Sequence, residues 1–287
     1  MNEEQSSDAT DAIRRAIILS ADMLGFSNMV CDARSSKDAL DLATRLGRFA
    51  EQFSGTDFED RDTHMYFDKK YWAFSDSIVV CWYGGSEAQA LMTDFDADLD
   101  QLSGIALAQA VIMRNDEQLV RGGVAQGWFL EHEDTVVGDA LVTAARIEKT
   151  IGTPFIGVEH QLYDHYLNHP VRKHYGTDPV KTLFIAPCGY TNDMPALDYF
   201  MTMLGEIDLS DDQIREAKTL PLGDSENFRN DCWSENRLSY IKWHRDFIVK
   251  GLQHPDEVVR VKYRALKQHH NYRATPLYPG RPDMLIP

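Results

Sequence analysis

The sequence predicts an α/β sandwich, in which helices flank a mixed β-sheet. Two observations lead to this fold class. First, short apolar runs rich in β-branched residues alternate with longer segments of helical periodicity between residues 16 and 186. Second, the 287 residues are 43% hydrophobic and 26% charged, which is the composition of a globular protein. This length suits one large domain, or a smaller domain with an appendage.

Strands and helices are predicted in order from local patterns. The segment 71–82 (YWAFSDSIVVCW) is aromatic and β-branched, which is typical of a strand. In the segment 35–53, Leu42, Leu46 and Phe49 fall on one side of a helix. The complete expected order is strand 16–21, helix 35–53, strand 71–82, helix 99–113, strand 120–129, helix 138–150, strand 153–159 and strand 180–186.

Composition divides the chain into three parts. Residues 1–15 are polar and acidic and are expected to form a flexible leader. Residues 16–186 contain the alternating pattern and form the main domain. A turn-rich stretch at 187–195 then suggests a boundary, so residues 187–287 are predicted to be a helical extension.

The charge of the chain is unevenly distributed. Its 29 Lys and Arg and 45 Asp and Glu give a net charge of −16, which disfavours nucleic acid as a partner. Residues 236–287 contain ten basic and four acidic residues, so this tail carries +6 and the remainder −22. We expect the basic tail to pack against the acidic body or against another subunit.

The sequence favours a cytoplasmic protein. Its four cysteines are widely spaced and form no C-x-x-C pair, as expected for free, buried thiols in a reducing compartment. No secretory signal is evident at the N-terminus, and no apolar run approaches the ~20 residues of a membrane span. His160, His165, His169 and the pair His269-His270 are interpreted as parts of solvated helix faces.

Asp22 and Asp76 are the strongest candidates for functional residues. Asp22 follows the apolar run AIILSA, and Asp76 lies between YWAFS and SIVV. A carboxylate beside a buried strand is costly unless it is paired or bound to a metal ion. Two such carboxylates on one sheet favour a divalent cation such as Mg²⁺ or Mn²⁺. The simpler alternatives are a helix cap for Asp22 and a solvent-facing strand position for Asp76.

Four segments in sequence order resemble class III nucleotide cyclases. They are DMLGFS at 22–27, FSDSI at 74–78, RGGVAQG at 121–127 and GDALVTAAR at 138–146. The resemblance covers roughly residues 16–186. It implies a mainly antiparallel sheet and identifies this part of the chain as a nucleotide cyclase catalytic domain.

The resemblance also implies roles for individual residues. Asp22, the backbone carbonyl of Met23 and Asp76 would hold two divalent cations, Mn²⁺ or Mg²⁺, and Arg146 would stabilise charge on the reacting phosphate. The backbone amides of Met23, Leu24, Gly25 and Phe26 would hold the triphosphate, as consecutive amides at a helix start bind anions. The family further implies a homodimer whose two sites lie at the subunit interface.

The sequence departs from the family where base and ribose are bound. Val142 replaces the usual Asn, whose ribose contact Thr143 could supply instead. The base-contacting positions are Trp72 and Thr135, which match neither the adenine-specific nor the guanine-specific pattern. Lys181, before an apolar strand, is a candidate cation for the triphosphate.

These departures resemble the pyrimidine cyclases of bacterial Pycsar anti-phage systems. That resemblance implies conversion of UTP to cyclic UMP, which then activates a separate effector protein. Three alternatives stay open: a cytidylate cyclase acting on CTP, an adenylyl or guanylyl cyclase with unusual base contacts, and an inactive cyclase-like binding module. The sequence does not distinguish UTP from CTP.

Overall fold

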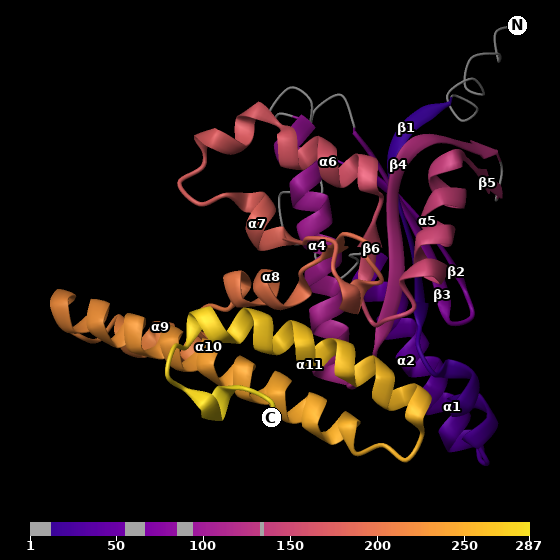
Figure 1. Ribbon diagram of the computed structural model, residues 1–287. Helices are drawn as coiled ribbons and strands as arrows, with labels where there is room; N and C mark the ends of the chain where they lie inside the picture. Colours follow the sequence, from indigo (N-terminus) through magenta and orange to yellow (C-terminus); the bar gives the residue numbers. More distant parts are fainter. Residues whose placement is uncertain (1–12, 55–66, 85–93, 133–134) are drawn as a thin grey trace, which may run out of the picture. The chain divides into compact units, whose positions relative to one another are not determined.

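The computed structural model describes residues 13–54, 67–84, 94–132 and 135–287 (Figure 1). The chain forms two compact units, Met1–Asp198 and Tyr199–Pro287. The first unit extends twelve residues beyond the boundary expected at residue 186. Its first described strand begins at Arg14, so Arg14 and Arg15, assigned to the leader, belong to the sheet.

The first unit is built on a sheet of eight strands within the described ranges, with the order β2-β3-β1-β4-β6-β8-β7 and β5 paired to β4. Among the described strand pairs only β4–β6 is parallel, so the sheet is mixed and mainly antiparallel, as the sequence predicted. The strands are β1 Arg14–Met23, β2 Phe67–Phe74, β3 Ser77–Gly84, β4 Val120–His132, β5 Thr135–Val137, β6 Ile156–Val158, β7 Phe184–Ile185 and β8 Ala196–Leu197.

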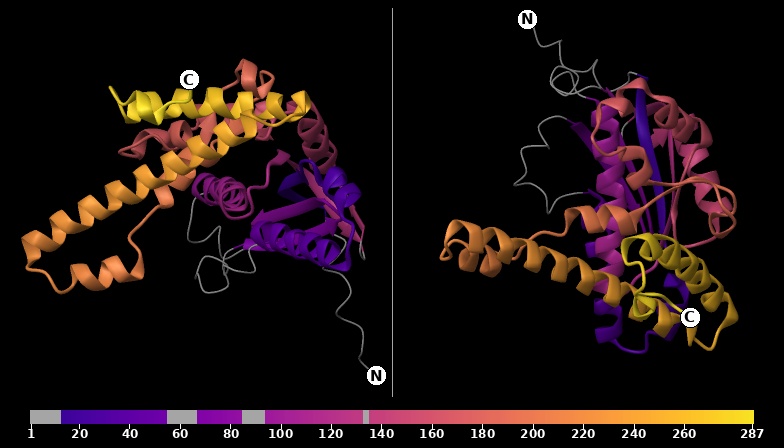
Figure 2. Two further views of the ribbon diagram at one scale, coloured as in Figure 1. Left: turned by 90° about the horizontal axis from the view of Figure 1, so that it is seen from below. Right: turned by 60° about the vertical axis from the view of Figure 1, so that its left-hand side comes forward.

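Helices cover both faces of this sheet, which confirms the predicted sandwich (Figures 1 and 2). Because side chains alternate along β1, Ile17 and Leu19 face one layer and Ile18 the other. The first layer contains buried residues of α2 (Ser36–Ser54) and α4 (Asp94–Asp116). The second contains Ala140, Ala144 and Ile147 of α5 (Asp139–Ile151). The shorter helical segments are α1 Phe26–Asp32, α6 His160–Asn168, η3 Pro170–His174, α7 Pro179–Leu183 and η4 Gly189–Thr191.

Two predicted strands differ from the structure. The segment 71–82 is a hairpin, because β2 ends at Phe74 and Ser75-Asp76 make the turn into β3. The segment 180–186 starts as the helical turn α7, for which Asp178 accepts a hydrogen bond from the amide of Val180 at 3.2 Å. Only Phe184–Ile185 is a strand. In both cases residues that favour a turn interrupt an apolar run. Such a run has the same sequence pattern in a strand and in a buried turn, so the pattern alone does not distinguish them.

A glycine allows α5 to lie close to β4. A Cβ atom added at Gly123 would approach the carbonyl oxygen of Ala144 to 2.1 Å and the amide nitrogen of Glu148 to 2.7 Å. Both are backbone atoms of α5, so only glycine fits here without moving the helix. This close approach sets the height of α5, and therefore of Glu148, above the sheet.

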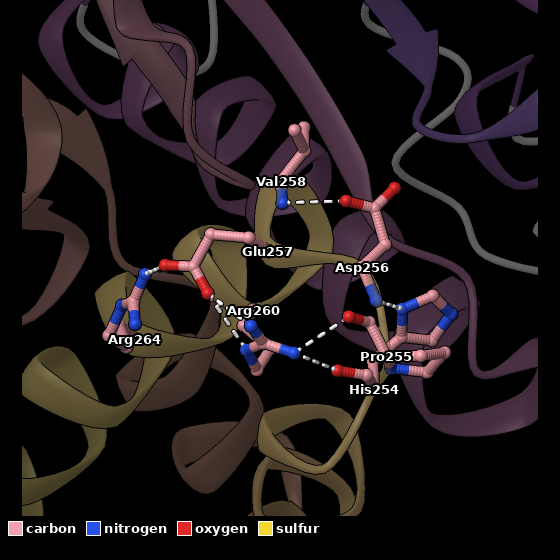
Figure 3. Close-up of polar contacts among 7 residues, drawn as sticks. All are labelled: His254, Pro255, Asp256, Glu257, Val258, Arg260 and Arg264. Atoms are coloured by element: carbon pink, nitrogen blue, oxygen red, sulfur yellow. Dashed lines mark hydrogen bonds and ion pairs between the residues drawn. The ribbon is translucent and has the colours of Figure 1, made fainter.

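The second unit is helical, as predicted for the C-terminal extension. Its helices are α8 Tyr199–Glu206, α9 Asp211–Ala217, α10 Leu222–Leu252 and α11 Glu257–Leu277, followed by the short helix η5 Pro282–Met284. Asp256 caps α11 by accepting a hydrogen bond from the amide of Val258 at 2.8 Å (Figure 3). The guanidinium of Arg260 donates to the carbonyl oxygens of His254 and Pro255, which fixes the turn between α10 and α11.

Buried histidines link the helices of this unit, which corrects the interpretation of His269 and His270 as solvated. His244, His269 and His270 are each 0% exposed. The Tyr199 hydroxyl lies 2.9 Å from Nε2 of His244, and Nδ1 of His244 lies 2.9 Å from Nδ1 of His270. Nε2 of His270 lies 2.8 Å from the carbonyl oxygen of Met284. The chain of contacts therefore joins α8, α10 and α11 to the C-terminal segment.

These contacts determine one arrangement of protons. The carbonyl of Met284 can only accept, so His270 carries its proton on Nε2 and its Nδ1 accepts. His244 then donates from Nδ1, and its Nε2 accepts from the hydroxyl of Tyr199. Every ring in the chain is neutral and satisfied. A further proton on Nδ1 of His270 would face the Nδ1–H of His244, so this arrangement of protons holds for neutral rings.

We expect the second unit to lose stability in acid. Burial lowers the pKa of His270 to about 4 and holds the pKa of His244 well below 6.5. Between pH 6.5 and 4 the unfolded chain therefore binds protons that the folded chain excludes, so stability is full above pH 6.5 and falls as pH decreases. For His270 alone the free energy of unfolding should fall by about 2 kcal/mol between pH 7.5 and 5.

Urea unfolding followed by the tryptophan fluorescence of Trp243, which contacts His244, measures this loss. The substitution His254→Gln is the control, because His254 is exposed and outside the chain of contacts. It should leave the pH dependence unchanged. An unfolding free energy independent of pH over this range would contradict the proton arrangement.

Candidate active site

Asp22 lies near the C-terminal end of β1, the strand between β3 and β4. Opposite it stand Ser77 on β3 and Arg121 on β4. The run Ala16–Ala21 before it is fully buried, whereas Asp22 is partly exposed. The apolar run therefore fixes β1 in the sheet, and the carboxylate stands where the strand emerges from the core.

The hairpin turn between β2 and β3 holds Asp76 beside Asp22. Ser75 takes a left-handed conformation with φ 59°, and the carbonyl oxygen of Asp76 accepts a hydrogen bond from the amide of Met23 at 2.9 Å. The hydroxyl of Ser77 lies 3.5 Å from Oδ1 of Asp22. Two acids 54 positions apart in the sequence are thus next to each other at the end of the sheet.

Two further charged residues, Arg121 and Glu148, complete the cluster. The guanidinium of Arg121 donates to Oδ2 of Asp22 at 2.9 Å and lies 3.6 Å from Oε1 of Glu148. Ser20, two residues before Asp22 on the same face of β1, donates from its hydroxyl to Oε2 of Glu148 at 2.6 Å. Arg121 therefore balances two carboxylates at once.

Arg121, Glu148 and Ser20 are site residues that the sequence patterns did not predict. Arg121 lies within the segment 121–127 that resembles the cyclase family, so a signal for it was present. No sequence pattern indicated Ser20 or Glu148, because these two residues meet only through the packing of α5 on the sheet.

The surroundings of Asp22 raise its pKa above the ordinary value. Burial is the largest cause, and the nearby carboxylates of Asp76 and Glu148 act in the same direction. The guanidinium of Arg121 opposes them, by its charge and by its hydrogen bond. The balance is that of an acidic cluster with too little positive charge, which a bound cation would supply.

The loop after β1 presents only part of the expected anion-binding amides. The amide of Met23 donates to Asp76, and that of Leu24 donates to the carbonyl oxygen of Leu119 at 3.0 Å. Gly25 turns the chain with φ 87° and precedes the first residue of α1. The amides of Gly25 and Phe26 have no acceptor among the described residues, so the anion-binding role narrows to these two.

Arg146 lies on α5 but apart from the acidic cluster. It is exposed, and its side chain contacts no charged partner within the described residues. It precedes Glu148 by two residues, which places the two side chains about 200° apart around the helix. Val142, one turn before Arg146, is 50% exposed, and Thr143 is half-buried. A single chain therefore points Arg146 away from Asp22.

The residues expected to contact the base are also dispersed. Trp72 on β2 is half-buried and packs against Phe129 of β4, with ring centroids 6.2 Å apart. Thr135 is exposed on β5, opposite His132. Lys181 is exposed and lies in α7, just before the short strand β7, and its charge acts on Asp178.

The donors at the cluster fit a hard divalent cation. Asp22, Asp76 and Ser77 offer oxygen atoms, which Mg²⁺ and Mn²⁺ prefer to nitrogen or sulfur. In the parts of the chain that the structure describes, no three His, Cys, Asp or Glu side chains are arranged to hold a metal ion. Mg²⁺ is commonly held by only one or two carboxylates together with substrate phosphates, so two acids suffice.

The four cysteines are free thiols, as expected, but they are not all buried. Cys81 and Cys232 are buried, Cys188 is half-buried and Cys31 on α1 is exposed. Among the described helices, none combines the length and the apolar character needed to cross a membrane.

Comparison with known proteins gives a slight likeness among solved structures and none elsewhere. No protein-family model matches the chain, and no curated protein matches it. Among solved structures, that of a bacterial light-regulated adenylyl cyclase aligns with 67% of this chain and 96% of its own, at 11% identity and a TM-score of 0.35. The proposed function therefore depends on the residues of the site.

The charge balance at Asp22 can be tested by changing either neighbour. Glu148→Gln removes a carboxylate but keeps an acceptor for Ser20, so the pKa of Asp22 should fall. Arg121→Gln removes the guanidinium, so the same pKa should rise. Titration of the Asp22 carboxyl carbon by NMR measures both shifts, with exposed Lys149→Gln on α5 as the control. Shifts of the same sign in the two variants would contradict this arrangement.

Proposed function

We propose that the chain is a nucleotide cyclase, and specifically a pyrimidine cyclase that converts UTP to 3′,5′-cyclic UMP and diphosphate. One observation carries the proposal: Asp22 and Asp76 lie together at the end of a buried sheet, beside the Gly25 turn whose amides are open to an anion. Paired acids next to such a turn suit a metal-bound triphosphate. The four segments that resemble class III nucleotide cyclases support cyclisation as the class of reaction.

The chain's own residues would divide the work as follows. Asp22, the Met23 carbonyl and Asp76 would hold two divalent cations, Mn²⁺ or Mg²⁺. When bound, these ions lower the pKa of the attacking 3′-hydroxyl and neutralise the leaving diphosphate. The amides of Gly25 and Phe26 would orient the triphosphate. Arg121 contacts Asp22 in the structure, and a cation there would release its guanidinium toward a phosphate.

The choice of a pyrimidine depends on what the base-contacting positions lack. Trp72 cannot provide the lysine that adenylyl cyclases use, and the short hydroxyl of Thr135 replaces an acid. A site that loses such hydrogen bonds to a purine loses most of its selectivity for it. The bulk of Trp72, held against Phe129, also suits a smaller base. Thr143 would contact the ribose, and Lys181 the triphosphate.

Two copies would be needed for a complete site. Arg146 and Glu148 point to different sides of α5, so the arginine that would stabilise the transition state faces away from its own Asp22. A homodimer in which Arg146 reaches the acids of the partner solves this problem and forms two equivalent sites. We further propose that the enzyme acts in the cytoplasm, and that its product activates a separate effector in anti-phage defence.

Product identification tests the activity. The chain should convert UTP, in the presence of Mn²⁺, to a product that co-elutes with cyclic UMP, and Asp22→Asn or Asp76→Asn should reduce the rate at least ~1000-fold. Lys173→Gln, on an exposed residue of η3, is the control and should retain full activity. Cyclic CMP as the main product would reassign the base to cytosine. A cyclic purine would indicate an adenylyl or guanylyl cyclase. If none of the nucleoside triphosphates yields diphosphate, the chain would instead be an inactive binding module.

Mixing two inactive variants tests the shared site. Asp76→Ala and Arg146→Ala each disable every site in a pure dimer, but a mixed dimer contains one site with both residues intact. Equal mixing should therefore restore about a quarter of the wild-type activity, since half of the dimers are mixed and each has one working site. Mixing Asp76→Ala with Asp22→Ala is the control, because both changes affect the same half of the site. No recovery in mixed dimers would contradict the shared-site arrangement.

A further inference from the structure

The first half of α10 and the short helix α9 form an arm that extends beyond α11 (Figures 1 and 2). We call residues 211–236 the acidic arm. They contain seven acidic and three basic residues, and all seven acids are exposed. The following residues 237–287, which we call the basic half, contain ten basic and four acidic residues. The second unit thus carries opposite charges on its two parts.

The change of sign falls at the middle of α10. Residues 222–236 of this helix carry one basic and four acidic residues, and residues 237–252 carry four basic and one acidic. The helix macrodipole favours acids in the first turn and bases in the last, but its effect does not reach further. It therefore accounts for Asp224 and Lys250 but not for the charges nearer the centre of α10.

Several of these charges lie on one exposed face along the whole helix. At 100° per residue, the charged positions of this face are acidic in the arm and basic in the basic half, except Asp246, which pairs with Arg245. It is made up of Asp224, Asp231, Glu235, Ser239, Lys242, Asp246 and Lys250, all of them exposed. Two such helices placed antiparallel about residue 237 bring Asp224 opposite Lys250, Asp231 close to Lys242, and Glu235 opposite Ser239. The face is complementary to itself.

The arm also exposes apolar side chains, on the side of α10 that faces away from the charged face. Leu222 is 89% exposed and Trp233 is 39% exposed. By helical spacing they lie on the same side of α10 as Tyr240 and Phe247, which are buried in the basic half. The guanidinium of Arg237 stacks over the ring of Trp233 at 4.2 Å and covers part of it. The side of α10 that is buried in its C-terminal half is therefore exposed in its N-terminal half.

We propose that two copies of the chain associate through the second unit, with their α10 helices antiparallel and the acidic arm of each on the basic half of the other. Such an interface is isologous, because each contact occurs twice about a two-fold axis near residue 237. It is distinct from the shared active site proposed above and does not depend on it. The α10 pairing would hold the two copies together independently of substrate.

Cross-linking between two tagged full-length chains tests this arrangement, with Cys31→Ser in both to remove the exposed native thiol. One chain carries Asp224→Cys and the other Lys250→Cys, and a short bismaleimide should join them. A pair in which both chains carry Asp224→Cys is the matched control. Antiparallel helices hold those two positions about 39 Å apart, beyond the reach of the reagent. Failure of the first pair to cross-link, or equal cross-linking of the control, would overturn the proposal.

Charge reversal tests the interaction that holds the copies together. Asp231→Lys with Glu235→Lys, or Lys242→Glu with Lys250→Glu, should raise the dissociation constant for association through α10 at least ~10-fold. The first reversed pair, Asp231→Lys with Glu235→Lys, leaves positions 224 and 250 free for the cysteines. Its association is therefore measured at low salt by the cross-link between Asp224→Cys and Lys250→Cys. For the second pair, light scattering measures the dimer fraction. Chains carrying all four changes together with Asp224→Lys should recover the dimer, because each facing pair of charges is again complementary. An unchanged dimer in both reversed variants would exclude this face.

Discussion

The ion pair between Arg121 and Asp22 is the interaction on which the candidate site depends. Arg121 lies opposite Asp22 in the β1–β4 register, and its guanidinium also reaches Glu148 on the helix above. One cation therefore links three elements: the end of β1, the start of β4 and α5. A single guanidinium leaves the three carboxylates of the cluster short of positive charge, and burial, more than this shortage, raises the pKa of Asp22. This shortage is the physical basis for proposing divalent cations here.

The overall acidity of the chain affects how a nucleoside triphosphate would approach the candidate site. A net charge of −16 repels a nucleoside triphosphate at long range. The open amides at the Gly25 turn and the guanidinium of Arg121 provide local attraction, and bound cations would reinforce it. The charges of the basic tail lie in the second unit beside an acidic arm of the same unit, and this pairing is the reason for proposing contact between copies.

The two units are stabilised by different means. The first depends on an apolar sheet buried between helices, with charged groups at its end. The second contains a buried polar chain from Tyr199 through His244 and His270 to the carbonyl of Met284. A fully satisfied polar network of this kind specifies one arrangement of helices, and it makes the unit sensitive to protonation.

The sequence by itself determined the sandwich, the order of most elements, and Asp22 and Asp76 as neighbours of buried strands, because hydrophobic periodicity and the cost of burying a carboxylate are local properties. Only the tertiary structure decided the rest. It added Ser20 and Glu148 to the site, split residues 71–82 into a hairpin, and buried His269 and His270. It also bonded two of the four expected amides within the chain and turned Arg146 away from Asp22. These outcomes depend on strand register and helix packing between residues up to 128 positions apart. No local pattern encodes which side chains meet over such separations.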